Sequence, residues 1–140
     1  MNNLNKTIEE INEIIAWYHG LPMDYNGINE IMFQRVQLIT HLAFYSSEMS
    51  DARIRWKNAE AETERVRRTE TKKAMSLNLP MAKAVEIGKF ESINEYANEK
   101  QWDGVYYQMR TFFDVCNGII DAMNQHISNL KREENQQKSV

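Results

Sequence analysis

The chain has 140 residues, of which 42% are hydrophobic and 26% charged, and a formal net charge of −3. This length suits a single domain. Five glycines and two prolines are too few for the turns of a β-sandwich or barrel, so the composition predicts an all-α protein. One cysteine excludes an internal disulfide. The sequence has no apolar run of about 20 residues and no apolar leader, which predicts a soluble, cytoplasmic protein.

The first predicted helix begins at Thr7, because residues 7–10 (TIEE) have the form of a capping box. Four isoleucines between positions 8 and 15 mark one apolar face at helical spacing. Gly20 and Pro22 end this helix, and the chain is expected to form a loop as far as position 27.

The second predicted helix runs from about Ile28 to Leu77, a stretch that contains neither glycine nor proline. Its apolar stripe is continuous to Trp56 and then thins. Such a helix would be roughly 75 Å long, so its far end is expected to project or to pack against another chain. Pro80 suits the first turn of a short helix from Met81 to about Gly88.

The last predicted helix follows a second capping box at residues 92–95 (SINE). Apolar side chains then repeat every seven residues at three positions of the heptad, a, d and e. This pattern is typical of a helix that touches two neighbours. This stripe suits either the core of one chain or an oligomer interface. Its members are Val105, Met109, Phe112, Phe113, Cys116, Ile119, Ile120, Met123, Ile127 and Leu130. The polar residues after Leu130 are expected to fray.

These elements predict a long helical hairpin with a short N-terminal helix and coiled-coil-like packing. Three segments follow: an N-terminal helix and loop (1–27), the hairpin core with its oligomerisation stripe (28–132) and a polar flexible tail (133–140). The broad stripe and the overlong middle helix also predict a homo-oligomer larger than a dimer.

The sequence lacks the motifs of common active sites. Its three histidines have no metal-ligand spacing, and His126 falls at a core position of the heptads. No glycine-rich phosphate loop or nucleophile elbow is present. Cys116 lies on the apolar stripe and is expected to be a small core residue. The chain is therefore predicted to be a non-enzyme without metal or cofactor.

The middle of the chain concentrates positive charge. Residues 53–73 hold eight basic and four acidic side chains, a balance of +4, which leaves −7 on the remaining 119 residues. Arg65, Arg68 and Lys72 share one helix face and could neutralise phosphates, while Trp56 could stack on an unpaired base. The candidate nucleic-acid-binding residues are Arg55, Lys57, Arg65, Arg67, Arg68, Lys72 and Lys73.

The alternative interpretation of this segment is a solvated helix face joined by ion pairs. Three glutamates alternate at positions 60, 62 and 64 and so point to different sides of the helix. They are expected to pair with Lys57, Arg67 and Arg68.

Two segments resemble a known family. Residues 42–46 (LAFYS) precede sequence rich in Ala, Glu and Arg, and residues 113–123 (FDVCNGIIDAM) come near the end. Together they resemble the recombination mediators of tailed bacteriophages, the UvsY-type family. The likeness covers the layout of residues 28–132 and is specific over residues 113–123.

The resemblance implies a non-enzymatic, helical, ring-forming protein of the bacterial host cytoplasm. Such mediators bind single-stranded DNA, contact the phage recombinase and help it to displace single-strand binding protein. The family's DNA-contacting stretch corresponds by charge and location to Arg65, Arg67, Arg68, Lys72 and Lys73. The aromatic pair that follows this stretch in the family is missing here.

Two other functions fit the same sequence. One is a phage or bacterial structural protein, such as a scaffold, tail or packaged virion component, assembled through helical coiled-coil contacts. The other is a regulator that binds a protein partner through its acidic surface.

Overall fold

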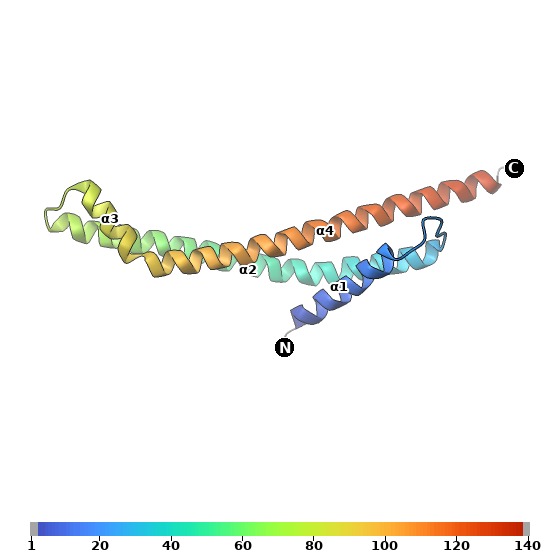
Figure 1. Cartoon of the computed structure of the whole chain (residues 1–140), viewed down its shortest axis with the longest axis horizontal. Helices are drawn as coiled ribbons and strands as arrows, with labels where there is room; N and C mark the ends of the chain where they lie inside the picture. Colours follow the sequence, from blue (N-terminus) through green and yellow to red (C-terminus); the bar gives the residue numbers. More distant parts are fainter. Residues whose placement is uncertain (1–2, 139–140) are drawn as a thin grey trace. The chain divides into compact units, whose positions relative to one another are not determined.

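The computed structural model describes residues 3–138, which form four α-helices and no strand (Figure 1). In chain order they are α1 (Asn3–His19), α2 (Ile28–Ser76), α3 (Met81–Glu91) and α4 (Ile93–Lys138). The helices pack against each other, which confirms the all-α prediction. Within the described residues, no helix combines the length and the apolar character needed to cross a membrane.

The chain divides into two compact units, which are described separately. Unit 1 comprises Met1–Glu48 and Arg110–Val140, and unit 2 comprises Met49–Met109. Both α2 and α4 therefore contribute one part to each unit. Unit 1 contains ten acidic and six basic side chains, whereas unit 2 contains ten acidic and eleven basic ones. The formal charge is thus −4 on unit 1 and +1 on unit 2.

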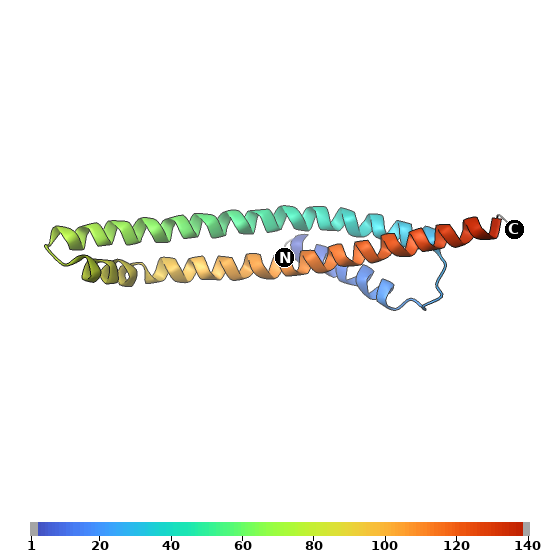
Figure 2. The ribbon, with the colours of Figure 1, turned by 90° about the horizontal axis from the view of Figure 1, so that it is seen from above.

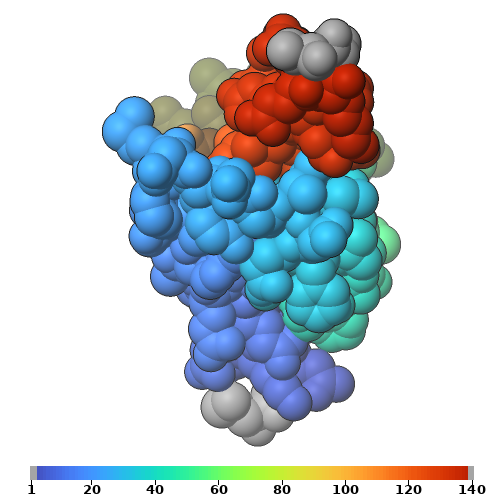
Figure 3. Space-filling view, turned by 90° about the vertical axis from the view of Figure 1, so that its right-hand side faces the viewer, coloured from blue at the N-terminus to red at the C-terminus, as the bar shows by residue number. Residues whose placement is uncertain are grey.

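Unit 1 is built from α1, the first part of α2 and the last part of α4 (Figure 3). The three segments bury large apolar side chains between them, and the Tyr45 ring packs against Phe112 with 5.1 Å between the ring centroids. Burial of such side chains is the main force that holds helices of this kind together. The buried apolar residues are Ile11, Ile14, Ile31, Leu38, Leu42, Tyr45, Cys116, Met123 and Ile127.

Unit 2 consists of the second part of α2, α3 and the first part of α4. The two long segments run side by side in both ribbon views (Figure 1, Figure 2). The buried residues here are small or polar: Ala52, Ala59, Thr63, Ala74, Ala84, Gly88, Ser92 and Glu99. A side chain at Gly88 would meet the Thr71 hydroxyl and lie 2.8 Å from the Arg67 carbonyl oxygen. Helices α2 and α3 therefore approach each other closely where only glycine fits.

The start of α1 differs from the sequence prediction. The helix begins at Asn3 and not at Thr7, so Thr7 lies one turn inside it. The buried Thr7 hydroxyl donates a hydrogen bond to the Asn3 carbonyl oxygen at 2.8 Å. The predicted capping box at Thr7 was therefore wrong: inside a helix, a threonine hydroxyl can donate a hydrogen bond to the carbonyl oxygen four residues earlier.

Ser92 separates α3 from α4, as the second capping box predicted, but the reciprocal cap does not form. The Ser92 hydroxyl donates to the Lys89 carbonyl oxygen at 3.2 Å. Within the described residues, Glu95 Oε2 is buried without a hydrogen-bond partner. Helix α3 also passes the predicted end at Gly88 and reaches Glu91, because Gly88 serves the contact with α2 and not a helix end.

The end of α4 also differs from the sequence prediction. The helix continues past Leu130 to Lys138, and the side chains of residues 131–138 are exposed. An ion pair between Glu134 and Lys138 (3.3 Å) supports this last stretch at i, i+4 spacing. The described part of the predicted flexible tail is thus helical, and residues 139–140 lie outside the described residues.

The predicted apolar stripe of α4 is partly core. Within unit 1 its members Cys116, Met123 and Ile127 are buried by the same chain. In unit 2, Val105 is 37% exposed and does not belong to the core. The ring and the oligomer larger than a dimer stay predictions.

Candidate nucleic-acid interface

The basic segment lies on α2 in unit 2, and its cations point in more than one direction. Arg65, Arg68 and Lys72 are exposed, as their predicted common helix face requires. Arg55, Lys57 and Lys73 are also exposed, whereas Arg67 is half-buried. The seven candidate residues therefore do not form one continuous surface.

Four of these cations form ion pairs with glutamates of the same helix. Arg65 Nε lies 2.9 Å from Glu62 Oε2, and Arg68 Nε lies 3.0 Å from Glu64 Oε1. The other two pairs are Lys73–Glu70 at 3.2 Å and Lys57–Glu60 at 3.7 Å. The hydrogen bond from Arg65 lowers the pKa of the Glu62 carboxyl. The predicted pairing of Lys57 and Arg68 is thus present, with Glu60 and Glu64 respectively.

Arg67 is the exception, because it does not pair with a glutamate of its own helix as predicted. Its Nε donates to the Ser92 hydroxyl at 3.3 Å, and its guanidinium carbon lies 5.2 Å from the centroid of the Tyr96 ring on α4. Glu62 pairs with Arg65 instead, which lies three residues away on the same side of the helix.

Other cations of unit 2 also lie over aromatic rings. The guanidinium of Arg55 is 5.1 Å from the ring centroid of Trp102, and Lys100 Nζ is 5.3 Å from that of Tyr96. Lys57 Nζ is 4.2 Å from the ring centroid of Trp56. Cations within about 6 Å of a ring face are attracted by its quadrupole. Unit 2 thus combines positive charge with aromatic surface.

Trp56, which was predicted to stack on an unpaired base, already contacts another aromatic ring. Its ring stacks on Tyr106 of α4, with centroids 5.6 Å apart and an interplanar angle of 20°. One face of the indole is therefore already covered within unit 2. Tyr96, Lys100 and Trp102 were not among the predicted site residues. The i, i+4 spacing of Tyr96 and Lys100 is the sequence signal that could have indicated them.

A shallow pocket of about 270 Å³ lies beside the basic segment in unit 2. Basic Lys57 and Arg67 line it together with acidic residues, of which Glu99 on α4 is buried. Because carboxylates repel phosphates, this side of the segment is a poor surface for nucleic acid. Arg65, Arg68 and Lys72 do not line this pocket.

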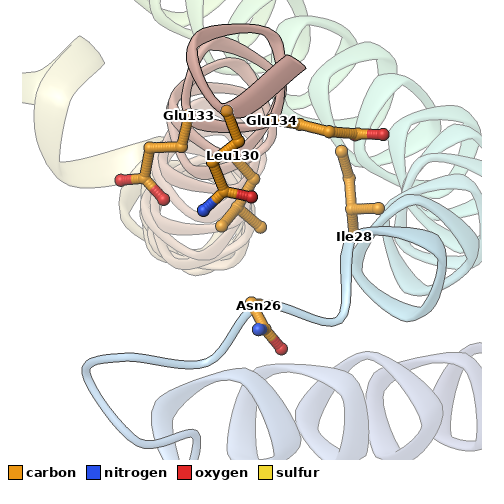
Figure 4. Close-up of a pocket in the computed structure, with 6 residues that line it drawn as sticks. Asn26, Ile28, Leu130, Glu133 and Glu134 are labelled. Atoms are coloured by element: carbon orange, nitrogen blue, oxygen red, sulfur yellow. The ribbon is translucent and has the colours of Figure 1, made fainter. Parts of the chain in front are cut away.

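A second shallow pocket, of about 230 Å³, lies in unit 1 between the loop after α1 and the end of α4 (Figure 4). Glu133, Glu134 and Gln137 line it from α4, and Asn26 and Ile28 line it from the other side.

Among the described residues, no group of three or more His, Cys, Asp or Glu side chains could hold a metal ion.

Both ring nitrogens of the half-buried His126 contact other residues of unit 1, as expected for a core histidine. Nε2 lies 3.0 Å from the Tyr25 carbonyl oxygen, and Nδ1 lies 3.4 Å from the Tyr18 hydroxyl. Burial raises the pKa of the Cys116 thiol to about 11, which lowers its reactivity as a nucleophile.

Comparisons of the chain with protein-family models, with curated proteins and with solved structures give no match.

Proposed function

We propose that the chain is a non-enzymatic recombination mediator that binds single-stranded DNA through unit 2. In this role it would help to load a phage recombinase against single-strand binding protein, as the resemblance to the UvsY-type family implies. The observation that supports this best is the row of exposed cations Arg65, Arg68 and Lys72 on α2, in a unit where other cations lie beside aromatic rings of α4. Proteins that bind single strands combine phosphate-neutralising cations with rings on which bases stack.

The exposed face of Arg65, Arg68 and Lys72 is the proposed track for the phosphates. Lys72 has no ion-pair or hydrogen-bond partner among the described residues. Arg65 and Arg68 are held by exposed carboxylates, and such solvent-screened surface pairs are weak. A phosphate can therefore replace a carboxylate at a small energetic cost.

The proposed stacking surface is on α4 and not at Trp56. Tyr96 and Tyr107 are both exposed, and Trp102 is half-buried beside Arg55. Stacking of a base on an aromatic side chain contributes about 1–3 kcal/mol and does not depend on sequence. Binding without strong sequence preference follows from this combination.

A single copy would bind weakly, because unit 2 carries a formal charge of only +1. In a homo-oligomer the same surface is repeated, and contacts along one strand act together through effective concentration. The acidic unit 1 would keep DNA from other surfaces.

The test is the fluorescence anisotropy of a labelled oligo(dT), measured at several salt concentrations between about 50 and 300 mM, around the physiological range. The logarithm of the affinity should fall linearly with the logarithm of salt, by about 0.7 per neutralised phosphate. R65E/R68E/K72E should weaken binding at least tenfold and flatten the slope. The matched control K131E/R132E/K138E makes the same charge change at three exposed cations of unit 1 and should bind much more tightly than the first variant.

A further variant, E62Q/E64Q/E70Q, releases Arg65, Arg68 and Lys73 from their partners and should tighten binding. Absence of binding at low salt contradicts the proposal. Equal weakening by the two charge-reversed variants contradicts the assignment to α2.

The glutamate pairs themselves favour a second candidate, a structural assembly protein. Four of the seven candidate cations are neutralised within their own helix, as on a solvated face. This candidate predicts large assemblies that form without DNA and an oligo(dT) affinity that the three glutamine substitutions leave unchanged.

A further inference from the structure

The outward side of α2 in unit 1 carries an uncharged stripe, defined here as Phe33, Val36, Thr40, Ala43 and Ser47. These residues follow each other at spacings of three and four, so they form one row along the helix. Ile39 and Phe44 flank the row, and the four large apolar side chains are between 39% and 56% exposed. In a chain with 26% charged residues, such a row is an unusual surface.

Two polar side chains of this part of α2 contact the other helices of unit 1. Arg35 donates a hydrogen bond to Asn124 of α4 at 2.7 Å. His41 lies 3.1 Å from Glu10 of α1. Helices α1 and α4 thus occupy the other sides of α2, and within unit 1 the stripe is left open.

The exposed apolar area of Phe33, Val36, Ile39 and Phe44 is roughly 400 Å², if a fully exposed large side chain presents about 200 Å². Patches of this size on soluble proteins often mark an interaction site. The area is about half of the roughly 800 Å² that each partner buries in a standard interface. The stripe can therefore form the apolar centre of a modest interface with a polar rim.

We propose that a second copy of this chain docks on the stripe, with the two α2 helices antiparallel. Phe33 and Val36 lie at one end of the row, and the small side chains Ala43 and Ser47 lie at the other end, where Phe44 flanks them. A two-fold axis near Thr40 places the large end of each copy on the small end of its partner. Such self-complementarity is what an isologous interface requires.

The lack of charge on the stripe favours an apolar face as its occupant, and the stripe of a second copy is such a face. The chain has a net charge of −3, so two copies repel each other over most of their surface. The stripe lacks charged side chains, and two copies can meet there without placing like charges in contact. The contact lies outside unit 2 and does not depend on DNA binding.

The first test compares two valines of unit 1 with almost equal exposure, Val36 at 53% and Val115 at 54%. Val36→Glu places a charge in the proposed contact and should raise the dimer dissociation constant at least tenfold. Val115→Glu makes the same change on α4 and should leave that constant within about twofold. Sedimentation equilibrium up to millimolar chain concentration measures both, and circular dichroism checks that both variants remain helical. A wild-type chain that stays monomeric throughout overturns the proposal, as does association that Val36→Glu leaves unchanged.

The second test determines the orientation. Nitroxide labels are attached to Thr40→Cys or to Ser47→Cys in a Cys116→Ala background, and distances between copies are measured by pulsed electron resonance. Seven residues of helix span about 10.5 Å, so labels at position 47 should be about 20 Å farther apart along the axis than labels at position 40. Equal distances at the two positions indicate a parallel pair and overturn the proposed arrangement. Failure of either test does not decide the proposal for unit 2, which oligo(dT) binding by the parent chain and by R65E/R68E/K72E measures separately.

Discussion

Units 1 and 2 share the two long helices but bury different kinds of side chain. In unit 1 the core consists of large residues, such as Ile11, Leu38 and Met123. In unit 2 the buried positions hold alanine, glycine, serine, threonine and one glutamate, while Ile54, Leu77 and Phe90 are exposed. The stability of unit 1 therefore depends on apolar area removed from water. In unit 2 the close approach of helix backbones is the stronger constraint, because small side chains bury little area.

The largest expected effect removes apolar volume from the core of unit 1. Met123→Ala deletes a fully buried side chain and leaves a cavity, so the free energy of unfolding should fall by about 2–5 kcal/mol. Met23→Ala is the matched control, since Met23 is fully exposed in the loop, and its effect should be near zero. Urea denaturation measures both. Similar effects at the two positions would mean that Met123 is not a core residue.

The corresponding test in unit 2 adds volume. In Gly88→Ala the new methyl group meets Thr71 and the Arg67 carbonyl, and such overpacking typically costs about 1–3 kcal/mol. Gly104→Ala is the control in the same unit: nothing lies within 4 Å of its new methyl group. This helical position should gain about 0.5–1 kcal/mol from the higher helix propensity of alanine. Thermal unfolding should therefore shift in opposite directions, and a gain at both glycines refutes the close contact between α2 and α3.

The smallest expected effect is a pH dependence that belongs to unit 1. Burial raises the pKa of Cys116 from 9.0 to about 11, so the unfolded chain loses this proton first as the pH rises. The stability that the folded chain gains from keeping this thiol protonated is fully present below pH 9 and is lost between about pH 9 and 11. Burial also raises the pKa of Tyr45 to about 12, which extends the same trend to higher pH.

Urea denaturation at pH 8 and pH 10 measures this loss. Cys116→Ala should lose less stability between the two pH values than the parent chain, because it lacks the titrating thiol. An equal loss in both proteins assigns the effect to other groups. Rapid labelling of native Cys116 by a thiol reagent at pH 8 is also inconsistent with a buried thiol.

The helical class and most helix ends could be predicted, because they depend on local chemistry. The α2 boundary at Ser76 follows from the residues after it: Asn78 adopts a left-handed φ of 65° and Pro80 opens the next helix. The start of α1 could not be predicted in this way. The Thr7 hydroxyl can cap a helix or bond back within it, and tertiary burial decides between the two.

The location of the basic segment was predictable from charge, but the direction of each side chain was not. Arg65 and Arg67 look alike in sequence, yet Arg65 is exposed and pairs with Glu62, whereas Arg67 contacts Ser92 and the Tyr96 ring of α4. The stacking of Trp56 on Tyr106 depends on a pairing of residues 50 positions apart, which no local pattern encodes. The apolar stripe of α4 occupies three adjacent heptad positions, a width that suits either a core or an oligomer interface. The sequence alone therefore left this choice open.

The small buried residues of unit 2 have a consequence for how the protein opens. Exposure of little apolar area on unfolding gives a small change in heat capacity and a shallow dependence of stability on temperature. Segments with few buried apolar contacts also open locally before the rest of a protein. Backbone amides of α3 and of the adjoining half of α2 should then exchange with deuterium through local openings, whereas those around Leu38 and Met123 wait for the unfolding of unit 1.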